Sequence, residues 1–172
     1  EDLEGQIADL GLDGIVTLAG SLPSEEIHRI LLEDTHVFAL PCVVESDGGM
    51  DNLPTVIMEA MAAGVPCVST RLAGVPEMID DGETGALVDP RDVEALADAI
   101  GRLLADVDLS TELGIAGRVR AEERFALETT AGSLLRHMRP HLRRIPGFLR
   151  KRPPKVRDKG FDIVRFMEGA EG

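Results

Sequence analysis

The feature that most restricts the fold of this chain is the stretch 51–70, which reads as a loop, a helix, a tight turn and a short strand. Apolar residues recur at helical spacing in this stretch, and they are Val56, Ile57, Ala60, Met61 and Ala63. Pro54 lies where a first helical turn would begin, a position that loses nothing by lacking an N–H. Gly64 and Pro66 then predict the end of the helix. We therefore expect a helix whose N-terminus opens directly after the polar, glycine-rich loop 45–50.

Two acidic residues accompany this helix: Asp51 precedes it, and Glu59 lies in its second turn. Free N–H groups at a helix N-terminus favour anions, above all phosphate. Carboxylates repel phosphate, but they suit sugar hydroxyls, which are donors. The alternatives are structural, since Asp51 could cap the helix and Glu59 could be an ordinary surface residue of a helix.

Seven residues separate Asp51 from Glu59, and the chain continues as Glu59-Ala60-Met61-Ala62-Ala63-Gly64-Val65-Pro66-Cys67-Val68. This pattern resembles the C-terminal, donor-binding half of the retaining GT-B glycosyltransferases (glycosyltransferase family 4-like, glycosyl transferases group 1). Their signature is an acidic residue, seven residues, and a Glu that opens Glu-Ala-Met-Ala-x-Gly-x-Pro-Val. Asp51 departs from the usual Glu, keeping the charge but shortening the reach. The similarity extends from about Leu10 to about Phe125.

The resemblance implies a role for each residue of the signature. Glu59 would take the ribose hydroxyls of a nucleotide, and Asp51 would hold a hydroxyl of the transferred sugar, so that both count as catalytic. Further donor-binding positions would be Asn52, Leu53, Thr55 and Val56. Backbone N–H groups of the last three would form the phosphate cradle, to which Pro54 cannot donate.

Two other loops resemble donor-binding segments of the family. Gly74 and Glu77 lie in Gly74-Val75-Pro76-Glu77, which is similar to the family's Gly-Gly-x-Pro-Glu, although a plain turn with Pro at the first helical position is an equal alternative. Gly20, Ser21 and Leu22 match the family's Phe-x-Gly-x loop beside the nucleobase.

Cofactors are not expected, because the sequence shows neither metal-ligand spacing nor a G-x-G-x-x-G fingerprint. By resemblance the enzymes are metal-independent, and the nucleotide-diphosphate sugar is the donor substrate. The four histidines, at positions 28, 36, 137 and 141, are expected to lack partners. Cys42 and Cys67 read as small buried residues in a reducing cytosol.

Strand-like and helix-like segments alternate along the chain, which predicts an α/β fold with a doubly wound parallel sheet, the Rossmann-like half of a GT-B fold. The expected strands are 15–18, 36–40, 67–70 and 84–88. The expected helices are 1–10, 24–33, 91–105, 110–124 and 127–144. Loops after Leu18, Leu40, Thr70 and Val88 should then share the ligand-binding edge of the sheet. The resemblance implies that the family's opening Gly-Arg…Lys-Gly segment and the N-terminal acceptor domain are missing, so we expect a partial donor domain over 1–144, truncated at its N-terminus and inactive alone.

Charge divides the chain into an acidic body and a basic tail. Residues 1–135 carry 27 acidic and 7 basic side chains, whereas residues 136–172 carry 4 acidic and 11 basic ones. An acidic body argues against nucleic-acid binding. The basic, proline-containing tail 145–172 favours contact of residues 145–159 with an anionic membrane surface. We expect a cytoplasmic protein that can lie peripherally on the cytoplasmic face of the membrane.

The expected function is that of a donor domain in a hexosyltransferase of polysaccharide biosynthesis. It would bind a nucleotide-diphosphate sugar for transfer, with retention, to a glycan or lipid-linked acceptor. Two alternatives remain open from the sequence: a non-catalytic nucleotide-sugar-binding remnant or interaction module, and a fragment of a GT-B phosphorylase or epimerase.

Overall fold

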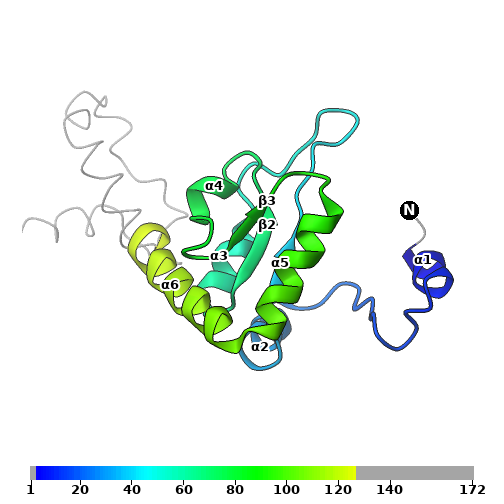
Figure 1. Ribbon diagram of the computed structural model, residues 1–172, viewed down its shortest axis with the longest axis horizontal. Coiled ribbons are helices and arrows are strands. Elements are labelled where there is room, and N and C mark those ends of the chain that lie inside the picture. The colour runs from blue at the N-terminus through cyan, green and yellow to red at the C-terminus, as the bar shows by residue number, and fades with distance from the viewer. Residues whose placement is uncertain (1–2, 127–172) are drawn as a thin grey trace, which may run out of the picture. The chain divides into compact units, whose positions relative to one another are not determined.

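The computed structural model describes residues 3–126 of the chain. Contacts divide the chain into one unit up to Arg118 and a second from Val119 onward. The first unit holds a sheet of three parallel strands, in the order β1 (Phe38–Leu40), β2 (Cys67–Thr70) and β3 (Ala86–Val88) (Figure 1). The predicted parallel α/β architecture is therefore confirmed for these strands.

Six helices accompany the strands in the described part of the chain. They are α1 (Leu3–Asp9), α2 (Ser24–Glu33), α3 (Thr55–Ala62), α4 (Val75–Met78), α5 (Val93–Ala105) and α6 (Val107–Phe125). Helix α3 packs on β1 and β2, and α5 packs on β2 and β3. In Figure 1, α5 passes in front of the strands and α3 lies behind them.

Consecutive residues of the central strand β2 show that both faces of the sheet are covered. The thiol of Cys67 lies 4.0 Å from the carbonyl oxygen of Ile57 in α3. Its neighbour Val68 packs instead with Leu103 of α5 and Leu113 of α6. Because successive side chains of a strand point to opposite faces, the two helical layers lie on opposite sides of the sheet. All four residues of β2 are buried, as expected for a central parallel strand.

Helix α3 ends in the turn that its sequence predicts. Gly64 has φ +79° and donates its N–H to Met61 O at 2.9 Å, while Val65 N–H reaches back to Ala60 O at 3.0 Å. These two bonds form a Schellman motif, which needs a left-handed residue and therefore favours glycine. Pro54 is the residue before the helix rather than its first residue.

The turn at Gly64 is also a contact point for α6. A Cβ built on Gly114 would lie 2.3 Å from Gly64 O and 3.5 Å from a ring carbon of Pro66. The backbone of α6 therefore reaches the α3–β2 turn at a distance that only glycine permits.

The predicted strand over 15–18 is wrong. Val16 forms only an isolated bridge with Asp13, and Ile15 and Leu18 are 76% and 48% exposed. A strand needs a neighbour that takes its backbone hydrogen bonds, and within residues 3–126 no strand pairs with this segment. The apolar composition of a segment is therefore not sufficient to predict that it joins the sheet.

Two further details concern the start of α2 and the buried face of α5. Ser24 begins α2 but does not cap it, since Pro23 is the preceding residue and no side chain accepts a cap hydrogen bond. In α5 the buried leucine is Leu103, while Leu104 is 59% exposed and Val93 74% exposed. The inward stripe continues from Leu96 through residues 99 and 100 to Leu103, which is the spacing of one helical face.

The expected helix over 127–144, the domain boundary at 144 and the basic tail lie outside the described residues. Within the described part, no helix has both the length and the apolar character needed to cross a bilayer.

Candidate functional site

The loops that follow the three strands meet at one edge of the sheet, called here the carboxyl edge. Ser69 Oγ donates to Leu40 O and Thr70 Oγ1 donates to Cys42 O, both at 2.6 Å, and Arg71 N–H donates to Val88 O at 2.8 Å. Ser69 and Thr70 are almost completely buried, so these bonds fasten the bases of the loops from inside the fold. The expected sharing of this edge holds for the loops after β1, β2 and β3.

The β1–α3 loop (residues 41–53) protrudes from the body as a finger, drawn in cyan in Figure 1. Its tip is a tight turn in which Glu45 N–H donates to Gly49 O at 2.8 Å and Gly48 N–H to Glu45 O at 3.0 Å. Asp47 Oδ1 accepts the Gly49 N–H at 2.8 Å. The tip of the loop is thus held by its own hydrogen bonds, and Asp51 follows it in the chain.

The carboxylate of Asp51 folds back on the backbone that follows it. Its Oδ1 accepts the N–H of Leu53 at 3.2 Å. The helix itself starts later, after Pro54, and its first internal bond runs from Ile57 N–H to Pro54 O at 3.1 Å. Asp51 therefore does not cap α3, and the Leu53 amide predicted for the phosphate cradle is occupied here by Asp51.

The start of α4 lies against the end of the same loop. Gly74 N–H donates to Asn52 O at 2.9 Å. A Cβ on Gly74 would stand 2.6 Å from that oxygen and 2.9 Å from Leu53 Cδ1. The structure thus brings the Gly74–Glu77 segment into contact with Asn52 and Leu53. The sequence predicts these two segments separately as donor-binding.

Glu59 has a neighbour that sequence reasoning missed. His28 of α2 places its Nε2 3.5 Å from Glu59 Oε2, and both side chains are about half exposed. The expectation that the histidines lack partners is therefore wrong for His28. The pairing depends on how α2 packs beside α3, which periodicity within either helix does not reveal.

The predicted nucleobase loop, Gly20 to Leu22, runs into α2. Gly20 has φ +66°, and Gly20 and Ser21 are exposed. Because residues 15–18 form no strand, this loop does not follow a strand to the carboxyl edge as the other loops do.

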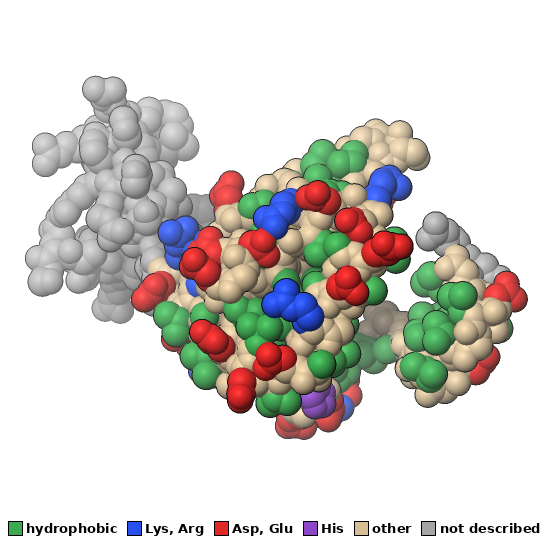
Figure 2. All heavy atoms as spheres, viewed as in Figure 1, with side chains coloured by type: hydrophobic (Ala, Val, Ile, Leu, Met, Phe, Trp, Pro, Cys, Tyr) green, Lys and Arg blue, Asp and Glu red, His purple; other side chains and the backbone are tan. Residues whose placement is uncertain are grey.

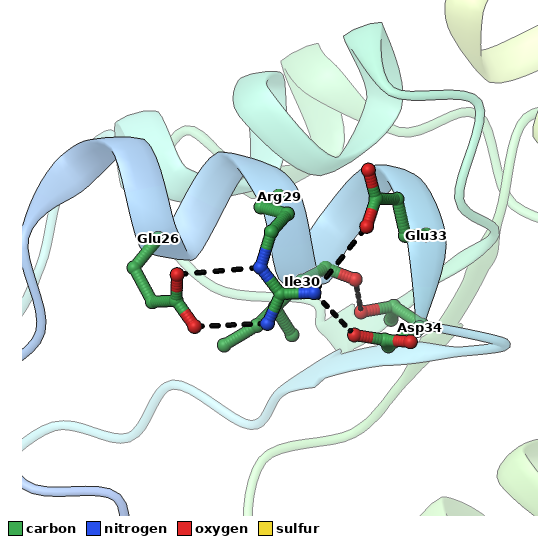
Figure 3. A network of polar contacts seen from close by, with 6 residues as sticks. Glu26, Arg29, Ile30, Glu33 and Asp34 are labelled. Carbon is green, nitrogen blue, oxygen red and sulfur yellow. Dashed lines mark hydrogen bonds and ion pairs between the residues drawn. The ribbon is translucent and has the colours of Figure 1, made fainter.

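Arg29 is held by three carboxylates on α2 and at its end (Figure 3). Its guanidinium bonds to Glu26 at 2.8 and 3.3 Å, to Glu33 at 3.3 Å and to Asp34 at 3.1 Å. These bonds raise the pKa of Arg29 above its ordinary value, Glu26 contributing most. The guanidinium of Arg29 therefore pairs with carboxylates of its own helix and of the residue that follows it.

Arg71 is held in the same way beside the carboxyl edge. It pairs with Asp81 and lies 3.8 Å from Asp89. Burial acts to raise the pKa of Asp81, but the bonds from Leu87 N–H and Arg71 outweigh it and hold that pKa below its ordinary value. Figure 2 shows acidic side chains spread over the visible face, with fewer basic side chains among them.

The two cysteines differ in burial, because Cys67 is buried as expected and Cys42 is only half-buried. Burial raises the pKa of Cys67 to about 12. Burial and the negative charge of Asp51 both raise the pKa of Cys42. No cluster of three or more metal-ligating side chains occurs within residues 3–126.

A sequence model of the family described as "Glycosyl transferases group 1" matches residues 1–106, which is more than half of the chain and includes every predicted site residue. The chain belongs to this family. The resemblance carried by Asp51 to Val68 is thereby confirmed.

One curated relative of this glycosyltransferase domain is the GDP-mannose-dependent alpha-(1-6)-phosphatidylinositol monomannoside mannosyltransferase of Mycolicibacterium smegmatis. It is 37% identical over 137 residues, which cover 78% of this chain and 35% of the relative. The chain therefore spans about a third of the length of that relative.

Solved structures give the same fold. Sucrose-phosphate synthase from Thermosynechococcus elongatus is similar with a TM-score of 0.68 and 31% identity, covering 81% of this chain and 34% of that one. HepE from Anabaena, solved in complex with UDP-glucose, matches with a TM-score of 0.69 and 23% identity, covering 81% and 36%. The Rossmann-like, parallel α/β architecture expected for half of a GT-B fold is confirmed.

Proposed function

We propose that this chain is the donor-binding domain of a retaining glycosyltransferase and binds a nucleotide-diphosphate sugar at the carboxyl edge. The observation that carries the proposal is the bond from Gly74 N–H to Asn52 O, which unites two donor-type segments beside the N-terminus of α3. Glu59 lies on that same helix. HepE is described in complex with UDP-glucose, and the mycobacterial relative is named as dependent on GDP-mannose, which supports a nucleotide sugar as ligand.

The proposed roles follow from the chemistry of each group. The amides of Thr55 and Val56 precede the first helical bond and would meet the diphosphate with the positive end of the helix dipole. The carboxylate of Glu59 would accept ribose hydroxyls, and Asp51 a hydroxyl of the sugar. For these roles, the hydrogen bond between Leu53 N–H and the Asp51 carboxylate would have to break. The carboxylate would then accept a sugar hydroxyl, and the Leu53 N–H would donate to a phosphate oxygen.

The reaction proposed for the whole enzyme is transfer of the hexosyl group to a glycan or lipid-linked acceptor without a metal. Departure of the nucleoside diphosphate would be assisted by backbone N–H groups aimed at its developing charge. The relative's name specifies a phosphatidylinositol monomannoside, which supports a lipid-linked acceptor. The acceptor-binding domain of such an enzyme is a proposed partner of this chain.

The test is calorimetric titration of the chain with UDP, GDP, UDP-glucose and GDP-mannose, with magnesium or with EDTA. We expect measurable affinity for at least one pair, unchanged by EDTA. Replacing Glu59 with Ala should weaken nucleotide binding by about 1.5 kcal/mol, the lower end for a hydrogen bond to a charged group, because the side chain is partly exposed. Strict dependence on magnesium, or equal affinity of Glu59→Ala and the parent, would contradict the proposal.

Peripheral membrane contact by the basic tail is proposed from sequence alone. Each basic group near an anionic surface contributes about 1 kcal/mol, and the attraction falls with ionic strength. We expect the chain to sediment with anionic but not with neutral liposomes, and to lose this binding at high salt or on truncation after Arg144. Equal sedimentation of the truncated chain would exclude the tail as the anchor.

A further inference from the structure

Two residues other than glycine have a left-handed backbone within residues 3–126: Ala73 with φ +48° and Arg91 with φ +69°. Such a conformation is unfavourable for any residue with a Cβ. Both residues lie in loops at the carboxyl edge, Ala73 after β2 and Arg91 after β3. Non-glycine residues in this conformation cluster at functional sites, so the use made of each side chain is informative.

Arg91 reaches from its own loop to the β1–α3 loop. Its Nη2 donates to Val44 O at 3.0 Å, a bond between residues 47 positions apart in the sequence. The backbone around Arg91 is a fixed base, because Asp92 N–H donates to Asp89 O at 3.2 Å and the Asp92 carboxylate caps α5 through Ala95 N–H at 2.9 Å.

The bond to Val44 lies at an important point of the β1–α3 loop. Below it, Thr70 holds the loop at Cys42 O. Beyond it lies the tip, whose described hydrogen bonds join Glu45, Asp47, Gly48 and Gly49 to one another. Arg91 is therefore the outermost described attachment of this loop to the body before the chain returns at Asn52.

We propose that Arg91 is a positioning residue, which holds the β1–α3 loop at the carboxyl edge and so fixes Asp51 for the sugar half of the donor. The inference rests on the proposed function and assigns the loop a part in recognising the sugar. Glu59 and the N-terminal amides of α3 do not depend on this bond, since they belong to a helix packed on the sheet. Loss of the bond should thus affect the sugar more than the nucleotide.

Arginine suits this task because its long side chain ends in five N–H donors in a rigid fork, which can reach a carbonyl on a neighbouring loop. The chain keeps Arg91 at a position where its backbone would favour glycine. Replacement of Arg91 by Gly removes the side-chain bond and also relieves the unfavourable backbone conformation. The first change should free the loop and the second should stabilise the fold, so the two effects can be measured separately.

The experiment compares Arg91→Gly and Arg91→Asn with Ala73→Gly. Asn tolerates the left-handed backbone but cannot match the reach of Arg. Ala73→Gly relieves the same kind of backbone without touching the bond to Val44. Limited digestion with a Glu-specific protease reports the freedom of the loop, because Glu45 lies in its tip. We expect cleavage after Glu45 to be at least five times faster in both Arg91 variants and unchanged in Ala73→Gly, with the melting temperature of Arg91→Gly at or above that of the parent.

Titrations with a nucleoside diphosphate and with its sugar conjugate (UDP and UDP-glucose, or GDP and GDP-mannose) then test the link to the donor. We expect the parent to bind the conjugate more tightly and both Arg91 variants to lose at least threefold of this preference, with affinity for the diphosphate alone within twofold. Unchanged cleavage after Glu45 would overturn the proposal, and so would an equal loss of affinity for both ligands, which would place Arg91 on the diphosphate instead. Absence of binding to the parent would refute the proposed function, while the cleavage rates would still decide whether Arg91 holds the loop.

Discussion

Replacing Gly74 with Ala is the sharpest test of the contact between α4 and the β1–α3 loop. The backbone of Gly74 is ordinary for any residue, with φ −82° and ψ −2°, so the effect is purely steric. The added methyl would meet Asn52 O at 2.6 Å and Leu53 Cδ1 at 2.9 Å. Leu53 is 48% exposed and can turn away, but the carbonyl oxygen belongs to the backbone and can move only with its loop.

The expected cost follows from these two contacts. Forcing a methyl into filled space costs typically 1–3 kcal/mol, and the hydrogen bond from Gly74 N–H contributes about 1 kcal/mol if the loop shifts away. Because the loop can move outward into solvent, we expect a loss of about 1–2 kcal/mol in the free energy of unfolding. Displacement of Asn52 should also weaken binding of the nucleotide sugar.

Urea denaturation measures the first effect and calorimetric titration the second. The matched control is Gly101→Ala in α5, where a Cβ meets nothing within 4 Å and Ala stabilises a helix by about 0.5–1 kcal/mol. If Gly74→Ala were as stable as Gly101→Ala and bound the donor as well as the parent, the described contact would not exist in solution.

Two further outcomes test the electrostatics of the carboxyl edge. Asp81→Asn should lower stability by about 1 kcal/mol at pH 7, a value discounted for the exposure of its pair with Arg71. Because the folded pKa of Asp81 lies below the unfolded value, this difference should persist above about pH 4 and vanish as the pH falls through the folded pKa, which urea denaturation at several pH values would show. With a thiol reagent at pH 8, Cys67 should react only when the chain unfolds. The Asp51→Asn variant should label faster at Cys42, because it lacks the charge that raises the pKa of that thiol. Equal labelling rates for the two thiols would contradict the site geometry.

The parts of the fold that could be predicted are those that neighbouring residues specify. The α3–β2 turn is one example, because Gly64 supplies the left-handed residue and Pro66 prevents continuation of the helix. The strand predicted at Cys67–Thr70 has the observed bounds, since a short apolar run after such a turn has few alternatives. In contrast, the apolar run 15–18 also predicts a strand, but within residues 3–126 no strand pairs with it.

The candidate site shows the same division. The sequence indicates Asp51 and Glu59 as the acidic residues of one signature and Gly74 as part of another segment, and their roles in donor binding remain predictions. It could not indicate that Gly74 bonds to Asn52 or that His28 lies beside Glu59, because these contacts depend on the packing of elements far apart in the chain. The sequence likewise does not predict the left-handed backbone conformation of Arg91, which reads only as a charged loop residue.

The contact between Gly64 and Gly114 has a consequence for recombining this domain with its relatives. It involves the backbone of α6 and a carbonyl oxygen of the α3–β2 turn, so no rotamer change can relieve an added methyl group. To make room for the methyl group, the helix or the turn would have to move as a whole. A chimera that takes the segment around position 114 from a relative should therefore fold only if that relative also carries glycine there, whereas Gly64 is favoured by its own left-handed backbone. The requirement for glycine at position 114 is thus set by a backbone oxygen that 49 intervening residues separate from it in the sequence.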